Sequence, residues 1–350
     1  MKLQIPDGIQ ANRPISELTT FEIGGPARFF AEPSGMTQIR ELLAWAKQEH
    51  ISVYPLGDGS NILASDAGYN GLLVRLNNQN IDIINKDEEQ VLIRVGAGMV
   101  WDNLVSFTVQ QDWAGIECLS GIPGRVGASP MQNIGAYGQE AAQAIQAVEV
   151  LDIDEMRSLV LQNEECKFAY RTSNFKTIWK GKYLITAVHF CLHIHGPANL
   201  RYRDLQNYFQ PNSSPSLSEV RQAVLDIRRS KSMLYDPSDP NHRCAGSFFL
   251  NPIVPLQEAN LLSKQNPGMP LYPVNNKCCK LSAAWLIDHA GFSKGYQQGC
   301  AKLSDKHVLC LVNAGGARAQ DIISLAQTIQ EKVHLKFGIE LTAEPNMLGE

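Results

Sequence analysis

The feature that most constrains this chain is a glycine-rich stretch at residues 121–138, GIPGRVGASPMQNIGAYG. Its glycines are Gly121, Gly124, Gly127, Gly135 and Gly138. Glycine lacks a Cβ, so a backbone rich in glycine can approach a ligand closely. A flexible surface loop is the alternative, but such loops are typically rich in small polar and charged residues, whereas this one carries Ile, Val, Met and Tyr. We therefore expect the stretch to wrap around a bound ligand.

A second glycine motif, GDGSN at residues 57–61, follows a predicted buried strand at 51–57. Successive backbone N–H groups in such a turn form an anion-binding concavity, and Ser60 and Asn61 add hydrogen-bonding groups. An ordinary tight turn explains this motif equally well on its own. The motif is not GxGxxG and no helix is predicted after it, so a Rossmann dinucleotide fold is disfavoured.

Composition excludes several classes of protein. Lys+Arg number 31 and Asp+Glu 35, with no basic stripe, so a nucleic-acid partner is not expected. The chain has no apolar run long enough for a membrane helix, and its N-terminus has no apolar core of a secretory signal. The 8 cysteines are scattered and form no CxxC, which predicts a reducing, cytoplasmic compartment and argues against structural zinc.

The hydrophobic pattern predicts an α+β chain. Strands are expected at 28–32, 51–57, 72–76, 81–84, 91–98, 147–153, 158–162, 183–194, 247–254, 308–312 and 339–345. Helices are expected after Ser34, which could cap the first of them, and at 100–112, 217–231, 255–265, 281–290 and 319–337. The Pro- and Ser-rich segment 210–219 is a candidate domain boundary.

Several motifs in this order resemble one known family. They are TFEIGGPARFF (20–30), PLGDGSNIL (55–63), SGIPGRVGASPMQNIGAYGQE (120–140), YRTSNFK (170–176), AGSFFLNP (245–252), KLSAAWLIDHAG (280–291) and GIELTAEPNMLG (338–349). Together they resemble the UDP-N-acetylenolpyruvoylglucosamine reductases, flavoproteins of bacterial peptidoglycan synthesis. The motifs span most of the chain.

The resemblance implies a two-part FAD-binding region of the vanillyl-alcohol-oxidase type, at residues 1–76 and 77–215. A nucleotide-sugar domain at 216–338 and a terminal segment at 339–350 would complete the chain. The implied cofactors are FAD and NADPH. The residues expected to hold FAD are Gly57, Asp58, Gly59, Ser60, Asn61, Gly121, Ile122, Gly124, Gly127, Ser129, Asn133, Gly135, Tyr137 and Gly138.

The implied reaction reduces an enolpyruvyl ether to a lactyl ether. Hydride would pass from flavin N5 to C3 of the enolpyruvyl group, and Ser247 matches the family's donor of a proton to C2. Arg171 and Glu344 match the pair that stabilises the enolate, Glu344 acting in its neutral form. Spacing alone cannot bring these three residues together; only the resemblance does.

The resemblance also implies how the anionic UDP-sugar substrate is held. Tyr202 matches a tyrosine-bearing loop found in the first type of the family, and Lys231, Arg228, Lys280 and Asn251 fit its substrate-binding positions. The chain departs from the common pattern at Thr19, Ala128 and Leu250. A monomer acting on small molecules is expected.

Two further patterns are interpreted as structural. Gly291–Gly295 matches the GxSxG nucleophile elbow, but a predicted helix precedes it where the elbow requires a strand. His193 and His195 share a strand face without a third ligand, which makes a poor metal site. Two alternatives to the reductase stay open: an FAD-linked oxidase of the same fold, and a non-catalytic nucleotide-sugar-binding protein.

Overall fold

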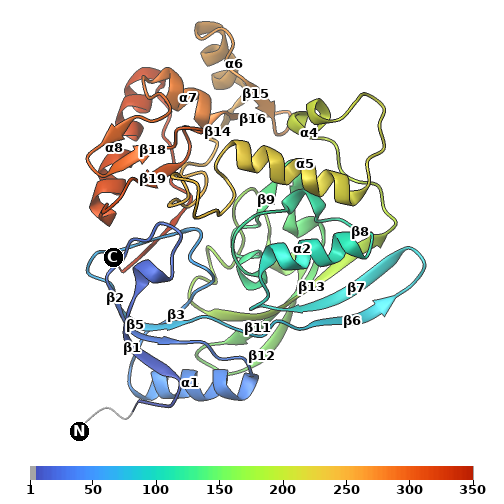
Figure 1. The fold of residues 1–350 in the computed structure, drawn as a ribbon, viewed down its shortest axis with the longest axis vertical. Coiled ribbons are helices and arrows are strands. Elements are labelled where there is room, and N and C mark those ends of the chain that lie inside the picture. Colours follow the sequence, from blue (N-terminus) through green and yellow to red (C-terminus); the bar gives the residue numbers. More distant parts are fainter. Residues whose placement is uncertain (1–4, 350) are drawn as a thin grey trace. The chain divides into compact units, whose positions relative to one another are not determined.

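The computed structural model describes residues 5–349, which form two compact units, each discontinuous in sequence (Figure 1). Unit 1 contains residues 26–59 and 69–230 together with the described residues before 14. Unit 2 contains residues 14–25, 60–68 and the chain from 231 onward. Within residues 5–349, no helix is both long and apolar enough to cross a membrane. The three-domain division expected from the sequence stays a prediction.

One sheet of unit 1 has the strand order β1-β2-β5-β3. Its strands are β1 (Ile9–Pro14), β2 (Pro26–Ala31), β3 (Val53–Pro55) and β5 (Tyr69–Val74), and β5 runs parallel to β2 and β3. Helix α1 (Met36–Gln48) follows β2 and places Trp45 5.2 Å from Phe29, ring to ring. Ser34 does not cap this helix, because the N-cap is Gly35 and the Ser34 N–H is bonded to Gln38 Oε1 instead.

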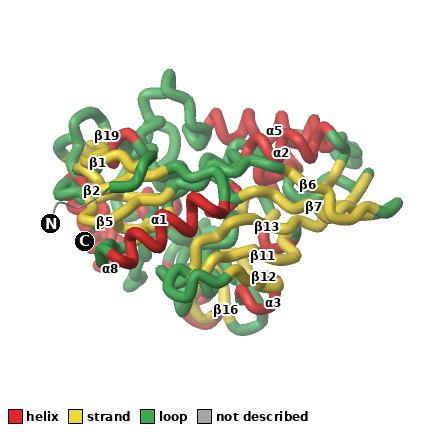
Figure 2. Tube along the Cα trace, turned by 90° about the horizontal axis from the view of Figure 1, so that it is seen from below, coloured by secondary structure: helices red, strands yellow, loops and turns green. Residues whose placement is uncertain are grey.

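The second sheet of unit 1 is antiparallel, in the order β12-β11-β13-β7-β6 (Figure 2). Its strands are β6 (Ile81–Lys86), β7 (Gln90–Gly96), β11 (Ile145–Asp152), β12 (Ser158–Gln162) and β13 (Tyr183–Ile194), with β8 (Trp113–Ala114) paired to β13. Alternate residues of β7, including Val91, Ile93 and Val95, are buried, as the period of a strand predicts. These strands share one apolar core with the first sheet.

The remaining elements of unit 1 support the glycine-rich stretch. They are α2 (Trp101–Gln110), the short pair β9 (Gly135–Ala136) and β10 (Gln139–Glu140), α3 (Asn163–Cys166), α4 (Arg203–Tyr208) and α5 (Leu217–Ser230). Arg221 of α5 forms a two-pronged ion pair with Asp102 of α2, at 2.6 and 2.7 Å. Asp102 also accepts the backbone N–H of Gly121 at 2.6 Å, so the two helices hold the start of the glycine-rich stretch.

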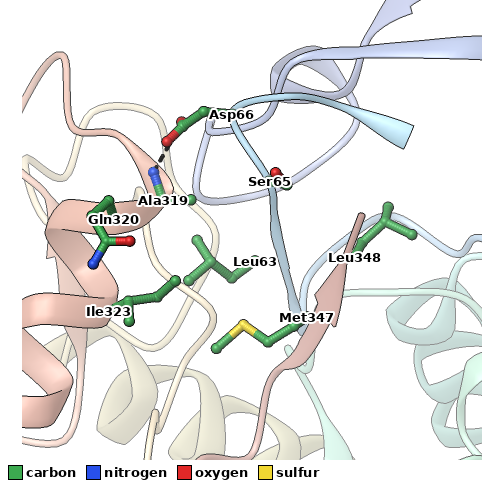
Figure 3. Close-up of a pocket in the computed structure, with 8 residues that line it drawn as sticks. All are labelled: Leu63, Ser65, Asp66, Ala319, Gln320, Ile323, Met347 and Leu348. Carbon is green, nitrogen blue, oxygen red and sulfur yellow. Dashed lines mark hydrogen bonds between the residues drawn. The ribbon is translucent and has the colours of Figure 1, made fainter. Parts of the chain in front are cut away.

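Unit 2 is built from short strands around a second apolar core. The strands form β14-β16-β15 (Ile253–Pro255, Cys278–Leu281, Leu271–Pro273), β17-β18-β19 (Gln297–Gln298, Ala301–Leu303, Leu311–Asn313) and the parallel pair β20-β4 (Asn346–Leu348, Ile62–Ala64). Its helices are α6 (Leu256–Gln265), α7 (Ala283–His289) and α8 (Ala319–Phe337). A pocket of about 190 Å³ lies between β4, β20 and the start of α8. Asp66 accepts the N–H of Ala319 there at 3.0 Å (Figure 3).

Three expected strands are largely wrong in their bounds, and one of them, 308–312, lies mostly in a turn because β19 covers Leu311–Asn313. Residues 247–254 contain only the start of β14, preceded by an isolated bridge between Phe249 and Ala343. The terminal strand lies at Asn346–Leu348 rather than 339–345. The apolar run FFL (248–250) indicates burial but does not show that the segment pairs with another strand. Pro252 also lacks the backbone N–H that a continuous strand needs.

Candidate active site

The two glycine motifs are joined by Arg125, within unit 1. Its guanidinium pairs with Asp58 at 2.6 Å and donates to the carbonyls of Leu76 and Gly98 at 3.1 and 2.9 Å. A Cβ built on Gly57 would lie 3.5 Å from the Ala128 methyl, an ordinary contact. Ala128, one of the departures from the family pattern, thus packs against the first motif. The sequence analysis missed Arg125. It could have been identified as the single charged residue of the glycine-rich stretch.

Backbone conformation explains several of the glycines. Gly59, Gly121, Gly124 and Gly138 have φ of +62, +70, +125 and +82°, values that L side chains rarely adopt. Residues with positive φ can turn neighbouring N–H groups toward one side and form an anion-binding concavity, which would suit the diphosphate of a dinucleotide such as FAD. Gly121 is an exception, because its N–H donates to Asp102. Gly127 has a different reason, because a Cβ there would lie 2.7 Å from the Cβ of Ala97.

Two side chains predicted to hold the cofactor are engaged within the protein. The Ser129 hydroxyl donates to Val126 O at 2.7 Å. The Asn133 amide donates to Glu140 Oε2 and Ala169 O, at 2.8 and 3.1 Å. The hydroxyl hydrogen of Ser129 and both amide hydrogens of Asn133 are therefore directed to protein acceptors rather than to FAD. The role of both residues as cofactor ligands stays a prediction.

Tyr137, Tyr202 and Arg228 form a cluster in unit 1. The two tyrosine rings meet edge to face, with centroids 5.4 Å apart. Burial raises the pKa of Tyr137 to about 12, while the charge of Arg228 acts in the opposite direction. Arg228, on α5, is only 8% exposed, whereas Tyr202 is 44% exposed. A predicted cofactor residue therefore contacts the predicted tyrosine of the substrate loop beside a buried cation.

Arg171 lies at the tip of a two-residue turn in unit 1. Ala169 and Thr172 exchange backbone hydrogen bonds of 3.0 and 3.2 Å on either side of it. Arg171 has φ of +55°, and its Nη2 donates to the carbonyl of Gly135. The turn therefore holds the predicted enolate-stabilising cation against the glycine-rich stretch.

Ser247 and Glu344 are brought close by main-chain pairing in unit 2. The Glu344 N–H donates to Phe248 O at 2.8 Å, and the Leu250 N–H donates to Thr342 O at 2.9 Å. Ser247 itself follows Gly246, whose φ is +69°. Pairing of these segments places the predicted proton donor one residue from the partner of Glu344, although almost a hundred residues separate them in sequence.

Asn61 of the first glycine motif contacts the same segment. Its side chain donates to Glu344 O at 3.4 Å, and its carbonyl accepts the N–H of Asn346 at 2.9 Å. A predicted cofactor residue thus supports the backbone of a predicted catalytic residue. The motif itself divides between the units, with Gly57–Gly59 in unit 1 and Ser60 and Asn61 in unit 2.

Two of the predicted substrate residues of unit 2, Lys280 and Asn251, lie on or near β16. Lys280 pairs in register with Ile253 and with Tyr272, a half-exposed aromatic that the sequence analysis missed. Asn251 accepts the N–H of Ala283 at 2.9 Å and so supports the start of α7. The sequence LYPVNNKCCKL (271–281) shows an aromatic residue and lysines close together, but it does not show which of them face each other across the strands.

Lys231 lies near a second residue that the sequence analysis missed. The pKa of His307 is lowered to about 4, mainly by burial and to a smaller extent by the charges of Lys231 and Lys294. The His307 ring accepts the N–H of Leu309 at Nδ1, at 3.1 Å, which requires that nitrogen to be unprotonated. The surroundings of His307 therefore carry excess positive charge, as an anionic substrate would require.

The patterns interpreted as structural keep that interpretation. Helix α7 precedes Gly291, whose φ of +100° ends the helix, so no strand leads into the GxSxG sequence. His195 pairs with Asp112 at 2.7 Å. In the described part of the chain, no three His, Cys, Asp or Glu side chains are grouped to hold a metal ion.

The structure thus gathers the predicted residues in two sets. Unit 1 joins Arg171 with the glycine-rich stretch and with the cluster of Tyr137, Tyr202 and Arg228. Unit 2 joins Ser247 and Glu344 with Asn61. That these sets meet on one substrate stays a prediction.

Two family models match the chain. Residues 27–156 match an FAD-binding domain, and residues 237–348 match the C-terminal domain of UDP-N-acetylenolpyruvoylglucosamine reductase. The matches confirm the expected pairing of an FAD-binding region with a C-terminal α+β domain.

Full-length relatives give the same result. The UDP-N-acetylenolpyruvoylglucosamine reductases of Thermobifida fusca and Neisseria gonorrhoeae are 41% and 40% identical to this chain. Each alignment covers 97% of both chains. The crystal structure of the corresponding enzyme from Thermus caldophilus matches with a TM-score of 0.66 at 26% identity, over 96% of this chain and 97% of that one.

Proposed function

Because the chain belongs to the UDP-N-acetylenolpyruvoylglucosamine reductase family, we propose that it reduces the enolpyruvyl ether of UDP-N-acetylglucosamine with electrons from NADPH. The product would be UDP-N-acetylmuramate, a peptidoglycan precursor. The observation that carries most weight is the joining of the two glycine motifs through Arg125 and Asp58, because it makes one cradle from segments far apart in sequence.

The cradle fits FAD in its donor set. The positive φ of Gly59, Gly124 and Gly138 suits a turn whose backbone N–H groups bind a diphosphate, and Gly57 leaves room at the junction of the two motifs. When bound there, FAD supplies the hydride that C3 of the enolpyruvyl group accepts. The role of the protein is to bind the cofactor, orient the substrate and exclude water.

Ser247 donates the proton that C2 requires. A serine hydroxyl is a weak acid, so it must face a strongly basic carbon in a site from which water is excluded. Phe248 and Phe249, each 1% exposed, follow Ser247, which is itself half-buried. Their main-chain pairing with residues 342–344 supports the placement of Glu344 beside it.

Arg171 and Glu344 stabilise the negative charge that builds on the substrate carboxylate. Arg171 keeps its charge at any physiological pH and can bind a carboxylate with two parallel hydrogen bonds. Glu344 donates a hydrogen bond in its neutral form. The negative charge on the substrate is therefore stabilised by one cation, Arg171, and by one neutral hydrogen-bond donor, Glu344.

The UDP-sugar is held by placed cations and aromatic residues. Lys231 and Lys280 bind the diphosphate, with Arg228 as a further cation, while Tyr202 closes over the substrate and Asn251 contacts the sugar-phosphate. We also place the enzyme in the cytoplasm as a monomer. The described cysteines form no disulfide, which supports a reducing compartment.

Stopped-flow measurement of the two half-reactions tests this proposal. NADPH should bleach the flavin, and the enolpyruvyl substrate should restore its colour much faster than air does. Rapid reoxidation by air alone would indicate an oxidase, and a colourless protein that cannot be reconstituted with FAD would indicate a binding protein.

The Ser247→Ala variant tests the proton donor. It should keep flavin reduction by NADPH but slow reoxidation by substrate by roughly 10²–10⁴-fold, the usual contribution of a general acid. Ser293→Ala, an exposed serine of the same unit, is the matched control and should leave both half-reactions unchanged. Survival of both half-reactions in Ser247→Ala would remove this role.

A further inference from the structure

The conformation of the turn that carries Arg171 is unfavourable by itself. A residue with a Cβ in the left-handed region costs roughly 1–2 kcal/mol, and Arg171 has φ of +55°. Such a conformation persists only where the surroundings enforce it. The contacts of this turn therefore identify the residues that position Arg171.

Asn133 makes the central contact. Its Nδ2 donates to Ala169 O at 3.1 Å, and that carbonyl also closes the turn by accepting the Thr172 N–H. Asn133 is 1% exposed and has φ of +48°. A buried amide in an uncommon conformation thus acts on the backbone two residues before Arg171.

The other partners of Asn133 fix the direction of its amide. Nδ2 also donates to the Glu140 carboxylate at 2.8 Å, and Oδ1 accepts the N–H of Ala142 at 2.9 Å. Both amide hydrogens and the carbonyl are therefore engaged within the protein. A flipped amide would place its oxygen against a carboxylate and a carbonyl.

Two further contacts join the same segments. The Ser173 hydroxyl donates to Met131 O at 2.7 Å, and Arg171 donates to Gly135 O. The alternate residues 131, 133 and 135 of the glycine-rich stretch thus each bind the turn at 169–173. Of the three contacts, only that of Asn133 comes from a side chain of the stretch.

We propose that Asn133 is a positioning residue for Arg171, rather than an FAD ligand through its side chain. This inference rests on the proposed function, because it assigns Arg171 to the enolate. A displacement of about 1 Å can cost 10²-fold in rate, so loss of the Asn133 amide should slow the step that uses Arg171. Flavin reduction by NADPH does not use that step.

The test compares Asn133→Asp with Asn163→Asp. Both residues are in unit 1 and donate Nδ2 to two acceptors, but those of Asn163 are Ala142 O and Ile145 O, neither of which belongs to the turn. Because Ala142 also donates its N–H to Asn133 Oδ1, this control reports any damage that passes through that shared neighbour. Asn133→Asp should keep its FAD dissociation constant and its reduction by NADPH within about twofold, and lose about 10²-fold in reoxidation by the enolpyruvyl substrate. Asn163→Asp should leave both half-reactions within about twofold of wild type.

A double-variant cycle separates positioning from general damage. If Asn133 acts through Arg171, then adding Asn133→Asp to Arg171→Ala should change the reoxidation rate by less than about twofold. If Asn133→Asp acted independently of Arg171, the two variants would each lower the reoxidation rate by their own factor, and the factors would multiply in the double variant. That result would overturn the proposal. So would a reoxidation rate of Asn133→Asp alone that stays within twofold of wild type.

Asn133→Gly serves if the aspartate variant does not fold, since glycine adopts the same φ without strain. It should show the same selective loss of reoxidation. Weaker FAD binding with normal reoxidation at saturating FAD, in either variant, would make Asn133 a cofactor ligand and overturn the proposal. Failure of the proposed function would be visible separately, because the wild-type enzyme itself would not be reoxidised by the substrate.

Discussion

The two units position their candidate catalytic residues by different means. In unit 1, side-chain hydrogen bonds hold a strained turn: Asn133 binds Ala169, Ser173 binds Met131, and Arg171 binds Gly135. In unit 2, backbone pairing between residues 248–250 and 342–344 brings the segments of Ser247 and Glu344 together. Single polar substitutions should therefore affect the first arrangement most, whereas packing changes should affect the second.

The largest expected effect is in unit 2. Phe248→Ala removes a side chain that is 1% exposed and packs against Phe21 and Phe249. The lost burial and the cavity left behind should lower the free energy of unfolding by about 3–5 kcal/mol, as urea denaturation would measure. Leu335→Ala, at 84% exposure, is the control and should change it by less than about 0.5 kcal/mol.

The next effect concerns the junction of the glycine motifs in unit 1. Arg125→Ala removes an ion pair and two hydrogen bonds to carbonyls and should cost about 2–3 kcal/mol. It should also weaken FAD binding, measured by flavin fluorescence. Arg28→Ala, whose exposed guanidinium makes one long hydrogen bond of 3.5 Å, should change neither quantity. Normal FAD affinity in Arg125→Ala would show that the junction does not shape the cradle.

A pH-dependent effect is expected in unit 2. The pKa of His307 falls from 6.5 to about 4 in the folded protein, so the unfolded chain binds more protons between these values. The protein therefore keeps its full stability with respect to His307 above pH 6.5. Its free energy of unfolding decreases as the pH falls from 6.5 toward 4. Since the ring keeps some solvent contact, we expect a loss of about 1–2 kcal/mol at pH 5.

His307→Gln provides the comparison for that loss. The variant should be less stable at neutral pH, but its free energy of unfolding should fall less steeply between pH 7 and 5. Equal slopes for wild type and variant, measured by urea denaturation, would assign the pH dependence to other groups.

The smallest effect tests side-chain support in unit 2. Thr20→Val keeps the shape but removes a buried hydroxyl that donates to Cys244 O at 2.6 Å. The expected cost is about 1 kcal/mol, with flavin reoxidation little changed. Thr328→Val, which removes a hydrogen bond within α8, is the control. A loss of reoxidation in Thr20→Val comparable to that in Asn133→Asp would remove the contrast between the units.

Much of the fold could be predicted from local pattern. Helix α8 occupies its predicted range. Helices α1, α2 and α5 each begin or end within two residues of the positions predicted for them. Long amphipathic periods and alternating strands are strong local signals. The short strands of unit 2 were poorly predicted because two or three residues carry no period, and their pairing depends on distant partners such as β4 with β20.

The sequence by itself indicated the family and the candidate residues, because the glycine-rich stretch and the serine motif depend on residue type and order. Only the tertiary structure revealed the surroundings of Asn133, Arg125 and His307. Their partners lie 36 and 67 residues away, or are charges from separate segments. A side chain at a given place in sequence does not reveal whether it faces a ligand or another loop, since that depends on the contacts made when distant segments pack together.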